Sequence, residues 1–154
     1  MTPAIARAEA AGIDFTVHEF RSDAGGGFGA RASAALGLPP ERVFKTLVAK
    51  LDASRLVVAI LPVSSQLDLK RLAAAGGAKR AALASSREAE RSTGYVFGGI
   101  SPLGQRQALP TFLDTSALGF ATTYVSGGRR GLELELTPHA LLDLCKGEAV
   151  RLVR

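Results

Sequence analysis

Apolar and polar positions alternate along the chain with two different periods. Period-two stretches rich in Val, Leu, Phe and Tyr predict short strands, and apolar residues at helical spacing predict helices. The predicted strands cover residues 14–20, 43–51, 55–63, 94–98, 111–114, 121–127 and 130–136. The predicted helices cover residues 3–11, 29–37, 65–77, 84–92 and 137–146.

The links between these elements indicate the fold class. A short polar link at 52–54 joins two strands and predicts a hairpin. Strands outnumber helices, and most links are too short for the crossovers that parallel strands need. We therefore predict an α+β fold, with a mixed, mostly antiparallel sheet rolled toward a barrel and helices packed outside. We expect residues 1–154 to form one domain.

Composition narrows the class of protein. A chain of 154 residues that is 47% hydrophobic can bury one core. It has no apolar run of transmembrane length, and its first twelve residues carry charges where a signal peptide is apolar, so we expect a soluble, cytoplasmic protein. The single cysteine, Cys145, excludes an internal disulfide, and its helical surroundings favour a small buried hydrophobe over a nucleophile.

Basic residues are concentrated in one part of the chain. The formal net charge is +5, and residues 66–106 hold seven basic side chains against three acidic ones, a surplus of four. Such a segment is typical of a surface that binds a phosphate backbone, although scattered solvated charges give the same sum. Charge alone leaves both interpretations open.

Lys45 is the first candidate for chemistry. Strand alternation places it on one face with Val43 and Leu47, and both faces of this strand are largely apolar. Its ammonium group must therefore reach solvent along its own stem, pair with an acid, or have a lowered pKa. Lys50, at the end of the same strand, is better explained as a lysine that reaches solvent.

Two glycine-containing stretches are the other candidates. Gly98 and Gly99 offer backbone N–H groups that a phosphate or an oxyanion can approach closely, although a strand ending at a bulge and a proline turn explains them equally well. Glu133 belongs to a strand whose glutamates are usually solvated, yet the preceding SGGRR segment, which starts at Ser126, could frame a polar ligand. The two histidines have no ligand-spaced partners, so we predict neither a metal nor another cofactor.

Four ordered blocks, and the N-terminal stretch before them, resemble the YbaK family of free-standing aminoacyl-tRNA deacylases. This family is related to the editing domain inserted in bacterial prolyl-tRNA synthetases. The blocks are VFKTLV at 43–48, PVSSQLDLKRLA at 62–73, RSTGYVFGGISPLGQRQALPTFLD at 91–114 and YVSGGRRGLELEL at 124–136. The similarity is closest to the Cys-tRNA(Pro) deacylase type, whose members remove cysteine mistakenly attached to tRNA(Pro) and use no metal.

The resemblance implies roles for individual residues. The essential lysine of the family corresponds to Lys45, and its Gly-Gly-Ile element corresponds to Gly98, Gly99 and Ile100. The family's usual aspartate is Glu133 here, and its common tyrosine is Phe20, which lacks the hydroxyl. The remaining substrate-binding candidates are Phe28, Ser101, Ser126 and Arg130. The candidates for binding tRNA are Lys70, Arg71, Lys79, Arg80, Arg91 and Arg106.

The family resemblance also implies a mechanism that needs no nucleophile from the protein. The thiol of the bound cysteine attacks its own ester carbonyl, giving a cyclic thioester and free tRNA. Our hypothesis is that the N–H groups of Gly99 and Ile100 hold the carbonyl oxygen, and that Lys45 positions the terminal ribose or a phosphate, or assists proton transfer. The expected partners are the acceptor stem of tRNA(Pro) and prolyl-tRNA synthetase. Because a small domain has little room to read an anticodon, we expect Cys-tRNA(Cys) to be accepted as well. Two alternatives stay open: editing of another aminoacyl-tRNA such as Ala-tRNA(Pro), and a non-catalytic module that binds nucleotide or RNA.

Overall fold

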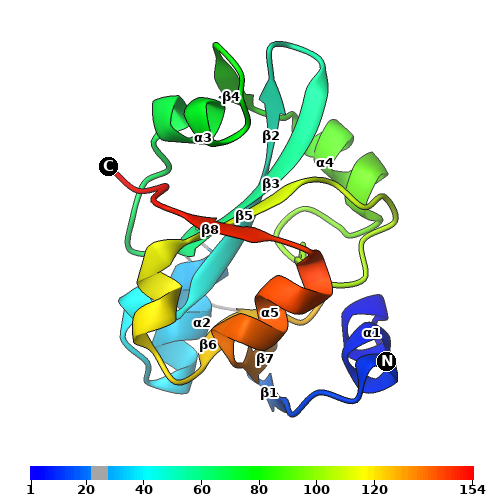
Figure 1. The fold of residues 1–154 in the computed structure, drawn as a ribbon. Helices are drawn as coiled ribbons and strands as arrows, with labels where there is room; N and C mark the ends of the chain where they lie inside the picture. The colour runs from blue at the N-terminus through cyan, green and yellow to red at the C-terminus, as the bar shows by residue number, and fades with distance from the viewer. Residues whose placement is uncertain (22–27) are drawn as a thin grey trace.

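The strands form two sheets that meet along one edge (Figure 1). The computed structural model describes residues 1–21 and 28–154, and the side chains described in the second range begin at Ala32. The smaller sheet is antiparallel in the order β1–β7–β6, and the larger is mixed in the order β4–β2–β3–β5–β8. A parallel bridge between Val43 and Tyr124 connects them. These strands are β1 (Thr16–Glu19), β2 (Phe44–Leu51), β3 (Arg55–Pro62), β4 (Ala81–Leu83), β5 (Thr111–Asp114), β6 (Thr123–Ser126), β7 (Leu132–Leu136) and β8 (Glu148–Val150).

The α+β class predicted from the sequence is confirmed, and so is the hairpin. β2 and β3 pair antiparallel from Phe44 opposite Pro62 to Leu51 opposite Arg55, and the turn between them uses positive φ at Asp52 and Ala53. No closed barrel forms within the described residues. The pairs β3–β5 and β5–β8 are parallel, because the long connections carrying α3, α4 and α5 leave room for crossovers.

The strand predicted at 94–98 is wrong. Gly94 has a φ of 82° and ends α4, and the chain then turns, with the Gly99 N–H donating to the Val96 carbonyl at 2.9 Å. Tyr95 is buried, and its hydroxyl donates to the Leu103 carbonyl. The apolar residues that suggested a strand therefore anchor a turn. The sequence prediction also missed the three-residue strands β4 and β8.

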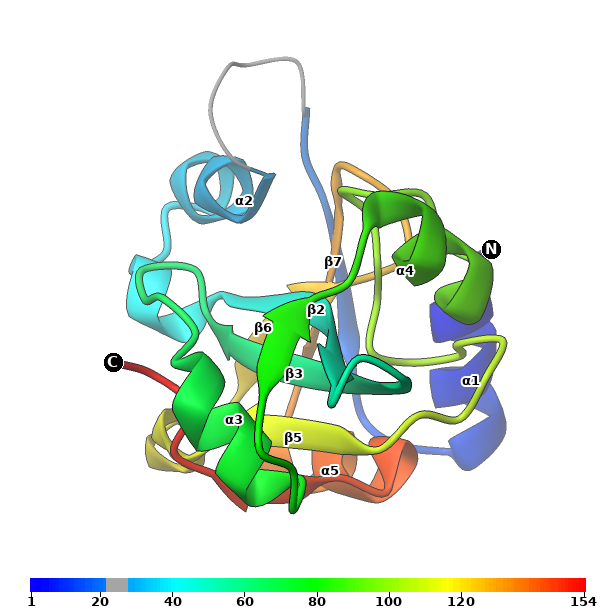
Figure 2. The ribbon, with the colours of Figure 1, turned by 90° about the horizontal axis from the view of Figure 1, so that it is seen from above.

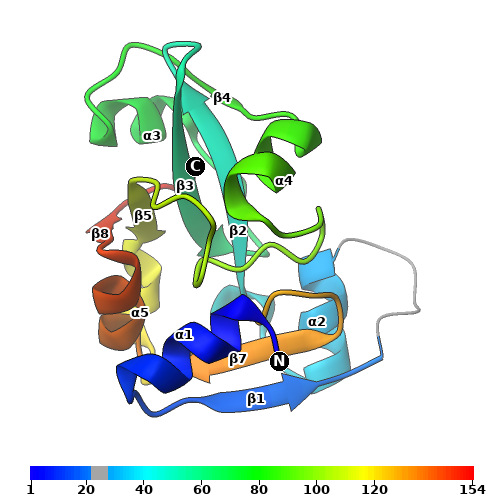
Figure 3. The same ribbon diagram turned by 90° about the vertical axis from the view of Figure 1, so that its right-hand side faces the viewer.

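The helices begin at capping residues that the sequence shows. The Thr2 hydroxyl accepts from the Ile5 N–H at the start of α1, and Ser85 forms a capping box with Glu88 at the start of α4. Figure 3 shows α3 and α4 flanking β2 and β3 on opposite sides, and α1 alongside β1 and β7. The helices are α1 (Pro3–Ala11), α2 (Phe28–Leu36), α3 (Leu69–Ala75), α4 (Ser86–Thr93) and α5 (Pro138–Cys145), with single turns η1 (Pro40–Arg42) and η2 (Thr115–Gly119).

The core divides at the larger sheet. One cluster contains Phe44 and Val48 of β2 together with Ile100, and the other contains Ala49 and Leu51 of the same strand. Because successive side chains point to opposite faces, β2 separates the two clusters. Figure 2 shows the loop after α4, which carries Ile100, running beside α1. Across the part of the chain described, none of the helices is both long and apolar enough to span a bilayer.

Candidate active site

The two glycine-rich segments singled out in the sequence contact each other. A Cβ placed on Gly99 would lie 2.9 Å from the Cα of Arg129 and 3.3 Å from the backbone nitrogen of Arg130, so the two backbones touch at this point. Gly128 has a φ of 109°, and a Cβ placed on it would lie 2.9 Å from the Tyr95 ring and 3.0 Å from the Cβ of Thr2. The absence of side chains at these positions therefore lets the turn after α4 pack against the β6–β7 loop.

The backbone donors of the turn differ in availability. The Gly99 N–H is used within the turn, since it donates to Val96, whereas no backbone acceptor among the described residues takes the Ile100 N–H. Gly98 has a φ of 94°, a conformation that favours glycine. The Ser101 hydroxyl is fully buried and accepts from the Leu103 N–H at 3.2 Å, so it closes the following turn.

Ser126 and Glu133 are cross-strand neighbours in the smaller sheet, with His18 opposite Glu133 on the other side. The Ser126 hydroxyl accepts from the Gly128 N–H at 3.2 Å, which is the contact of a turn residue. Arg130 is exposed between β6 and β7. The structure thus brings Ser126 and Glu133 together directly beneath the loop that contacts Gly99.

Glu133 is buried, although sequence alternation most simply predicted a solvated side chain. It is 7% exposed, and burial raises the pKa of its carboxyl to about 8. Within residues 1–21 and 28–154 no group donates a hydrogen bond to this carboxyl. A buried acid that lacks a partner favours the alternative of a polar ligand site.

Glu135, on the same face of β7, has a full set of partners. His18 Nε2 lies 2.9 Å from its Oε1, and the Thr122 hydroxyl donates to its Oε2 at 2.6 Å. Mainly because of the Thr122 hydrogen bond, the pKa of this carboxyl is lowered. His18 is therefore a satisfied histidine, as the sequence suggested, and His139 is exposed.

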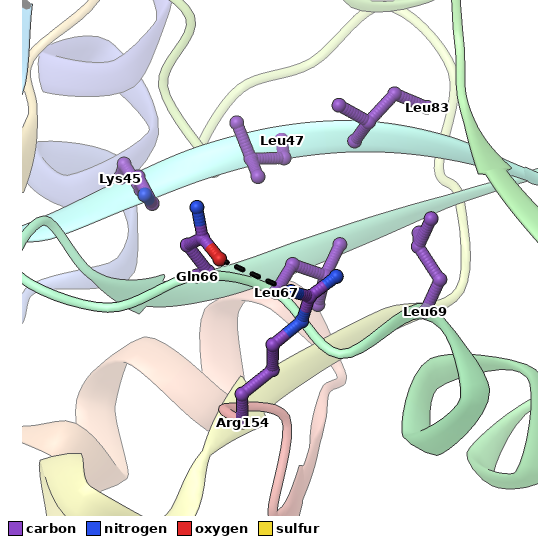
Figure 4. Close-up of a pocket in the computed structure, with 7 residues that line it drawn as sticks. All are labelled: Lys45, Leu47, Gln66, Leu67, Leu69, Leu83 and Arg154. Carbon is purple, nitrogen blue, oxygen red and sulfur yellow. Dashed lines mark hydrogen bonds between the residues drawn. The ribbon is translucent and has the colours of Figure 1, made fainter.

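Lys45 lines a cavity of about 350 Å³ on the face of β2 opposite the core cluster that contains Ile100 (Figure 4). Its ammonium group donates to the Ser65 carbonyl at 2.7 Å, and burial lowers its pKa. Of the three outcomes that the sequence left open for Lys45, the structure supports the lowered pKa. Lys50 instead forms an ion pair with Glu88. The other residues lining the cavity are Leu47, Gln66, Leu67, Leu69, Leu83 and Arg154.

Thr46 is a further candidate that the sequence analysis missed. Its hydroxyl oxygen is buried and has no hydrogen-bond partner among the described residues. Alternation places Thr46 between Phe44 and Val48, on the face of β2 whose core cluster includes Ile100. Its position next to Lys45 was the available signal, but sequence cannot show that a threonine hydroxyl lacks a partner.

The first half of β2 has an open edge. β4 pairs with β2 only at Ala49–Leu51, so residues 44–47 have no strand partner on that side within the described residues. The Ala84 N–H donates to the Val48 carbonyl on this edge. Because residues two apart in a strand direct their N–H and carbonyl groups to the same side, those of Thr46 also point to this edge. This edge lies between the face of β2 that carries Lys45 and the face that carries the Thr46 side chain.

The remaining predicted residues divide into two sets. Phe20 packs, partly buried, against the cluster of Ala32, Val43 and Tyr124, whereas Phe28 begins α2 with a side chain outside the described part. All six predicted tRNA-binding residues are exposed. They form two groups on opposite sides of β2 and β3. Lys70, Arg71, Lys79 and Arg80 lie in α3 and the segment before β4, and Arg91 and Arg106 lie in α4 and the loop after it.

None of the nucleophile candidates among the described residues is activated. The hydroxyls of Ser101 and Ser126 both accept backbone N–H groups, and His18 is bound to Glu135. Burial raises the pKa of the Cys145 thiol to about 12, and this thiol donates to the Pro102 carbonyl at 3.4 Å. The site offers backbone and side-chain donors and a buried acid, but no activated attacking group in the described chain.

Sequence comparison finds relatives that act on aminoacyl-tRNA. The chain is 40% identical over 114 residues to an Enterococcus faecalis protein described as a candidate Cys-tRNA(Pro)/Cys-tRNA(Cys) deacylase, a match covering 74% of this chain and 70% of the relative. It is also 40% identical over 73 residues to an Escherichia coli K12 protein named multifunctional Ser/Thr-tRNA deacylase ProXp-y. That match covers 46% of this chain and 44% of the relative.

Solved structures share the fold over the full length. A crystal structure described as a candidate trans-editing enzyme for prolyl-tRNA synthetase superposes with a TM-score of 0.86 at 24% identity, covering 100% of this chain and 99% of that one. A hypothetical protein superposes with a TM-score of 0.88 at 22% identity, covering 99% of each chain. The sequence profile of the aminoacyl-tRNA editing domain matches residues 29–144. The chain therefore belongs to the aminoacyl-tRNA editing domain family.

Proposed function

We propose that this editing domain deacylates Cys-tRNA(Pro), with the substrate thiol as the attacking group. Family membership supports hydrolysis of an aminoacyl-tRNA ester, and the Enterococcus relative favours cysteine as the amino acid. The observation that carries the proposal is the site's lack of an activated nucleophile among the described residues, beside donors and a buried acid suited to hold an aminoacyl ester. In such a site the attacking group must come from the substrate or from water.

The chemistry balances with cysteine as its own nucleophile. The sulfur attacks the ester carbonyl, a C–S bond forms, and the bond from the carbonyl carbon to the ribose oxygen breaks. The thiol proton ends on the ribose oxygen, which gives free tRNA and a cyclic thioester. Water then opens the thioester to cysteine. The carbonyl oxygen becomes negative during attack, and a fixed backbone N–H is the group that stabilises it.

The Ile100 N–H is the donor best placed for this oxygen, because the Gly99 N–H that the sequence also suggested is engaged by Val96. Gly98 and Gly99 then shape the turn that presents Ile100. Thr46 supplies an unpartnered hydroxyl on the same face of β2. The open edge of β2 is where the aminoacyl group would lie.

Glu133 would bind the α-amino group of the substrate. An aminoacyl ester carries an ammonium group in its protonated form, and a buried carboxyl without a cationic partner gains most from one. Binding would then lower the Glu133 pKa and form a charge pair with the substrate. Ser126, the cross-strand neighbour of Glu133, and the exposed Arg130 are proposed as polar contacts, and Phe20 and Phe28 as apolar contacts.

Lys45 would act by positioning. It lies on the opposite face of β2 from the cluster containing Ile100, and it already donates to Ser65, which suits contact with the terminal ribose or a phosphate better than proton transfer at the ester. Two of the three donors of an ammonium group stay available for that contact.

The exposed basic residues would hold the acceptor stem of tRNA(Pro) through phosphate contacts. Because such contacts release counterions, affinity for tRNA should fall steeply between 50 and 200 mM salt. Binding that does not change with salt would argue against this surface. The trans-editing fold favours prolyl-tRNA synthetase as a partner that delivers the substrate, and pull-down of the synthetase with and without tRNA(Pro) tests that.

One assay separates the candidate functions. Purified wild-type protein and Lys45→Ala are incubated with Cys-tRNA(Pro), Ala-tRNA(Pro), Ser-tRNA(Pro) and Pro-tRNA(Pro). Rapid loss of the cysteinyl ester alone supports the proposal. Fast turnover of the seryl ester rules out thiol attack and points to water as nucleophile, the chemistry that a Ser/Thr-tRNA deacylase such as the Escherichia coli relative would use. Inactivity on all four esters overturns the catalytic proposal.

A further inference from the structure

Two large apolar side chains are exposed at the turn that leads into Gly98–Ile100. Val96 is 73% exposed and Phe97 is 52% exposed. Their exposure is built into the turn, because the Phe97 N–H donates to Glu90 Oε2 at 2.7 Å and the Gly99 N–H donates to the Val96 carbonyl. An aromatic ring held in solvent beside a candidate active site is a feature that core packing does not explain.

Arginines flank this apolar tip on both sides. The Arg106 side chain lies against Gly94, 3.6 Å from where a Cβ would stand, and the backbone N–H of Arg106 donates to the Thr93 carbonyl. Arg129 contacts Gly99 through its backbone, and its side chain is exposed. The acids nearby are already engaged: Glu90 with the Phe97 N–H, and Glu19 with Arg129 at 3.9 Å.

We propose that Phe97 is a stacking platform for an unpaired base at the 3′ end of the tRNA, with Arg106 and Arg129 contacting the adjacent phosphates. The combination of an exposed aromatic ring and flanking cations is the one that binds single-stranded nucleic acid. Phe97 lies three residues before Ile100, a separation of at most about 10 Å along the chain, so a base on its ring lies close to the reacting ester. The inference rests on the proposed function and adds the contact that holds the end of the substrate.

A protein partner fits the tip less well. A stable protein interface buries at least about 1,000 Å², whereas this apolar surface consists of two adjacent side chains between arginines. An unpaired nucleotide needs one ring face and one or two cations, which is what the tip provides.

The absence of tryptophan from the sequence allows a direct test. Phe97→Trp introduces a single tryptophan, whose fluorescence can be excited selectively and whose ring keeps a stacking surface. The variant is titrated with an RNA hairpin that carries no amino acid and ends in an unpaired CCA, and with the same hairpin lacking those three nucleotides. We expect saturable quenching by the first RNA and none by the second. The matched control is Leu118→Trp, at an exposed apolar position on η2, away from α4 and the loop after it, which should not respond (Figure 1).

Phe97→Ala gives the energetic measurement. Loss of one base stack should weaken binding of the CCA-ended hairpin roughly tenfold and leave the blunt hairpin unchanged. Equal affinity of the wild type and Phe97→Ala for the CCA-ended hairpin overturns the proposal, as does equal quenching of Phe97→Trp by both RNAs. A loss of binding to the synthetase without any change in RNA affinity also overturns it, in favour of a protein contact.

The readouts separate this inference from the proposed function, because neither binding assay uses an amino acid. If the wild type deacylates Cys-tRNA(Pro) and Phe97→Ala binds the CCA-ended RNA normally, only the stacking platform is overturned. If Phe97→Ala loses CCA binding but the wild type deacylates no ester, only the catalytic proposal is overturned. Since Phe97 is exposed, its substitution should leave the thermal midpoint of unfolding near that of the wild type.

Discussion

Glu133 and Glu135 lie two residues apart on one face of β7, and the pKa values of their carboxyls are shifted in opposite directions. Burial raises the pKa of Glu133 to about 8, and no partner among the described residues offsets it, whereas hydrogen bonds from Thr122 and His18 lower the pKa of Glu135. Identical side chains on one strand thus differ because their surroundings differ. A pair of acids separated in this way is typical of a functional site.

Stability should therefore depend on pH through Glu133. Between pH 4.5 and about 8 the folded protein keeps a proton on this carboxyl that the unfolded chain has released, so stability decreases as pH rises across that window. Glu133→Gln cannot ionise. It should be more stable than the wild type at pH 8, by on the order of a few kcal/mol, and equal to it near pH 4. Denaturant unfolding of both proteins at the two pH values measures this difference.

Glu135→Gln is the matched control for that measurement. In the wild type the pKa of the Glu135 carboxyl is lowered in the folded state. The stability that this carboxyl contributes is therefore present above pH 4.5 and is lost as pH falls through its folded pKa. This variant should be less stable than the wild type at pH 8, the reverse of Glu133→Gln. If both variants shift stability in the same direction, the assigned environments of the two carboxyls are wrong.

Lys45 and Lys50 form a natural pair for testing the role of the half-buried lysine. Lys45→Met keeps the length of the side chain but removes the ammonium group, and we expect deacylation to fall at least a hundredfold while the fold persists. Lys50→Met removes an ion pair at the far end of the same strand and should leave activity unchanged. Single-turnover rates and circular dichroism spectra of both variants provide the check. Comparable activity of Lys45→Met and Lys50→Met would exclude a substrate contact at Lys45.

Gly99 should not tolerate a methyl group. Its Cβ would meet the backbone of Arg129 at 2.9 Å, and since backbone cannot rotate away, Gly99→Ala should displace the loop and cost roughly 1–3 kcal/mol of stability. Activity should decrease further than stability explains, because Ile100 follows directly. Gly119→Ala, where a Cβ meets nothing within 4 Å, should be neutral. Thermal unfolding and deacylation rates of the two alanine variants test both expectations.

The Thr46 hydroxyl, which has no partner in the described part of the chain, predicts a conflict between stability and activity. Thr46→Val removes a buried polar atom without a hydrogen bond and should stabilise the fold by about 1 kcal/mol. The same change should raise KM for the aminoacyl-tRNA. Thr46→Ser keeps the hydroxyl and should have a KM close to that of the wild type. A Thr46→Val enzyme with unaltered KM would show that this hydroxyl does not meet the substrate.

The sequence predicted most of the elements because their signals are local. Caps at Thr2 and Ser85 and the link at 52–54 are fixed by neighbouring residues. The segment 94–98 has the composition of a strand, but Gly94 and Gly98 adopt positive φ and Tyr95 turns inward. The three-residue strands β4 and β8 form because longer strands offer them an edge, which no local pattern reveals.

The candidate site was predicted less completely than the fold. The position of Lys45 within a strand was predicted correctly, and the structure brings the two glycine-rich segments into contact, while their importance for function stays a prediction. Whether Glu133 is solvated or buried depends on tertiary packing, and so does the missing partner of Thr46. The use of the Gly99 N–H inside its own turn also appears only in three dimensions. The site-residue assignments themselves stay predictions until the variants are measured.

Thr2 has a consequence for handling this protein. Its hydroxyl accepts the first hydrogen bond of α1 and donates to the Gly127 carbonyl, in the loop that carries Arg129. A cut or fusion that replaces Thr2 therefore alters a segment 125 residues away in sequence. Recombinant versions of the protein should keep this threonine. An affinity tag is better attached through a linker after Arg154, or before Met1, than inserted in the first turn of α1.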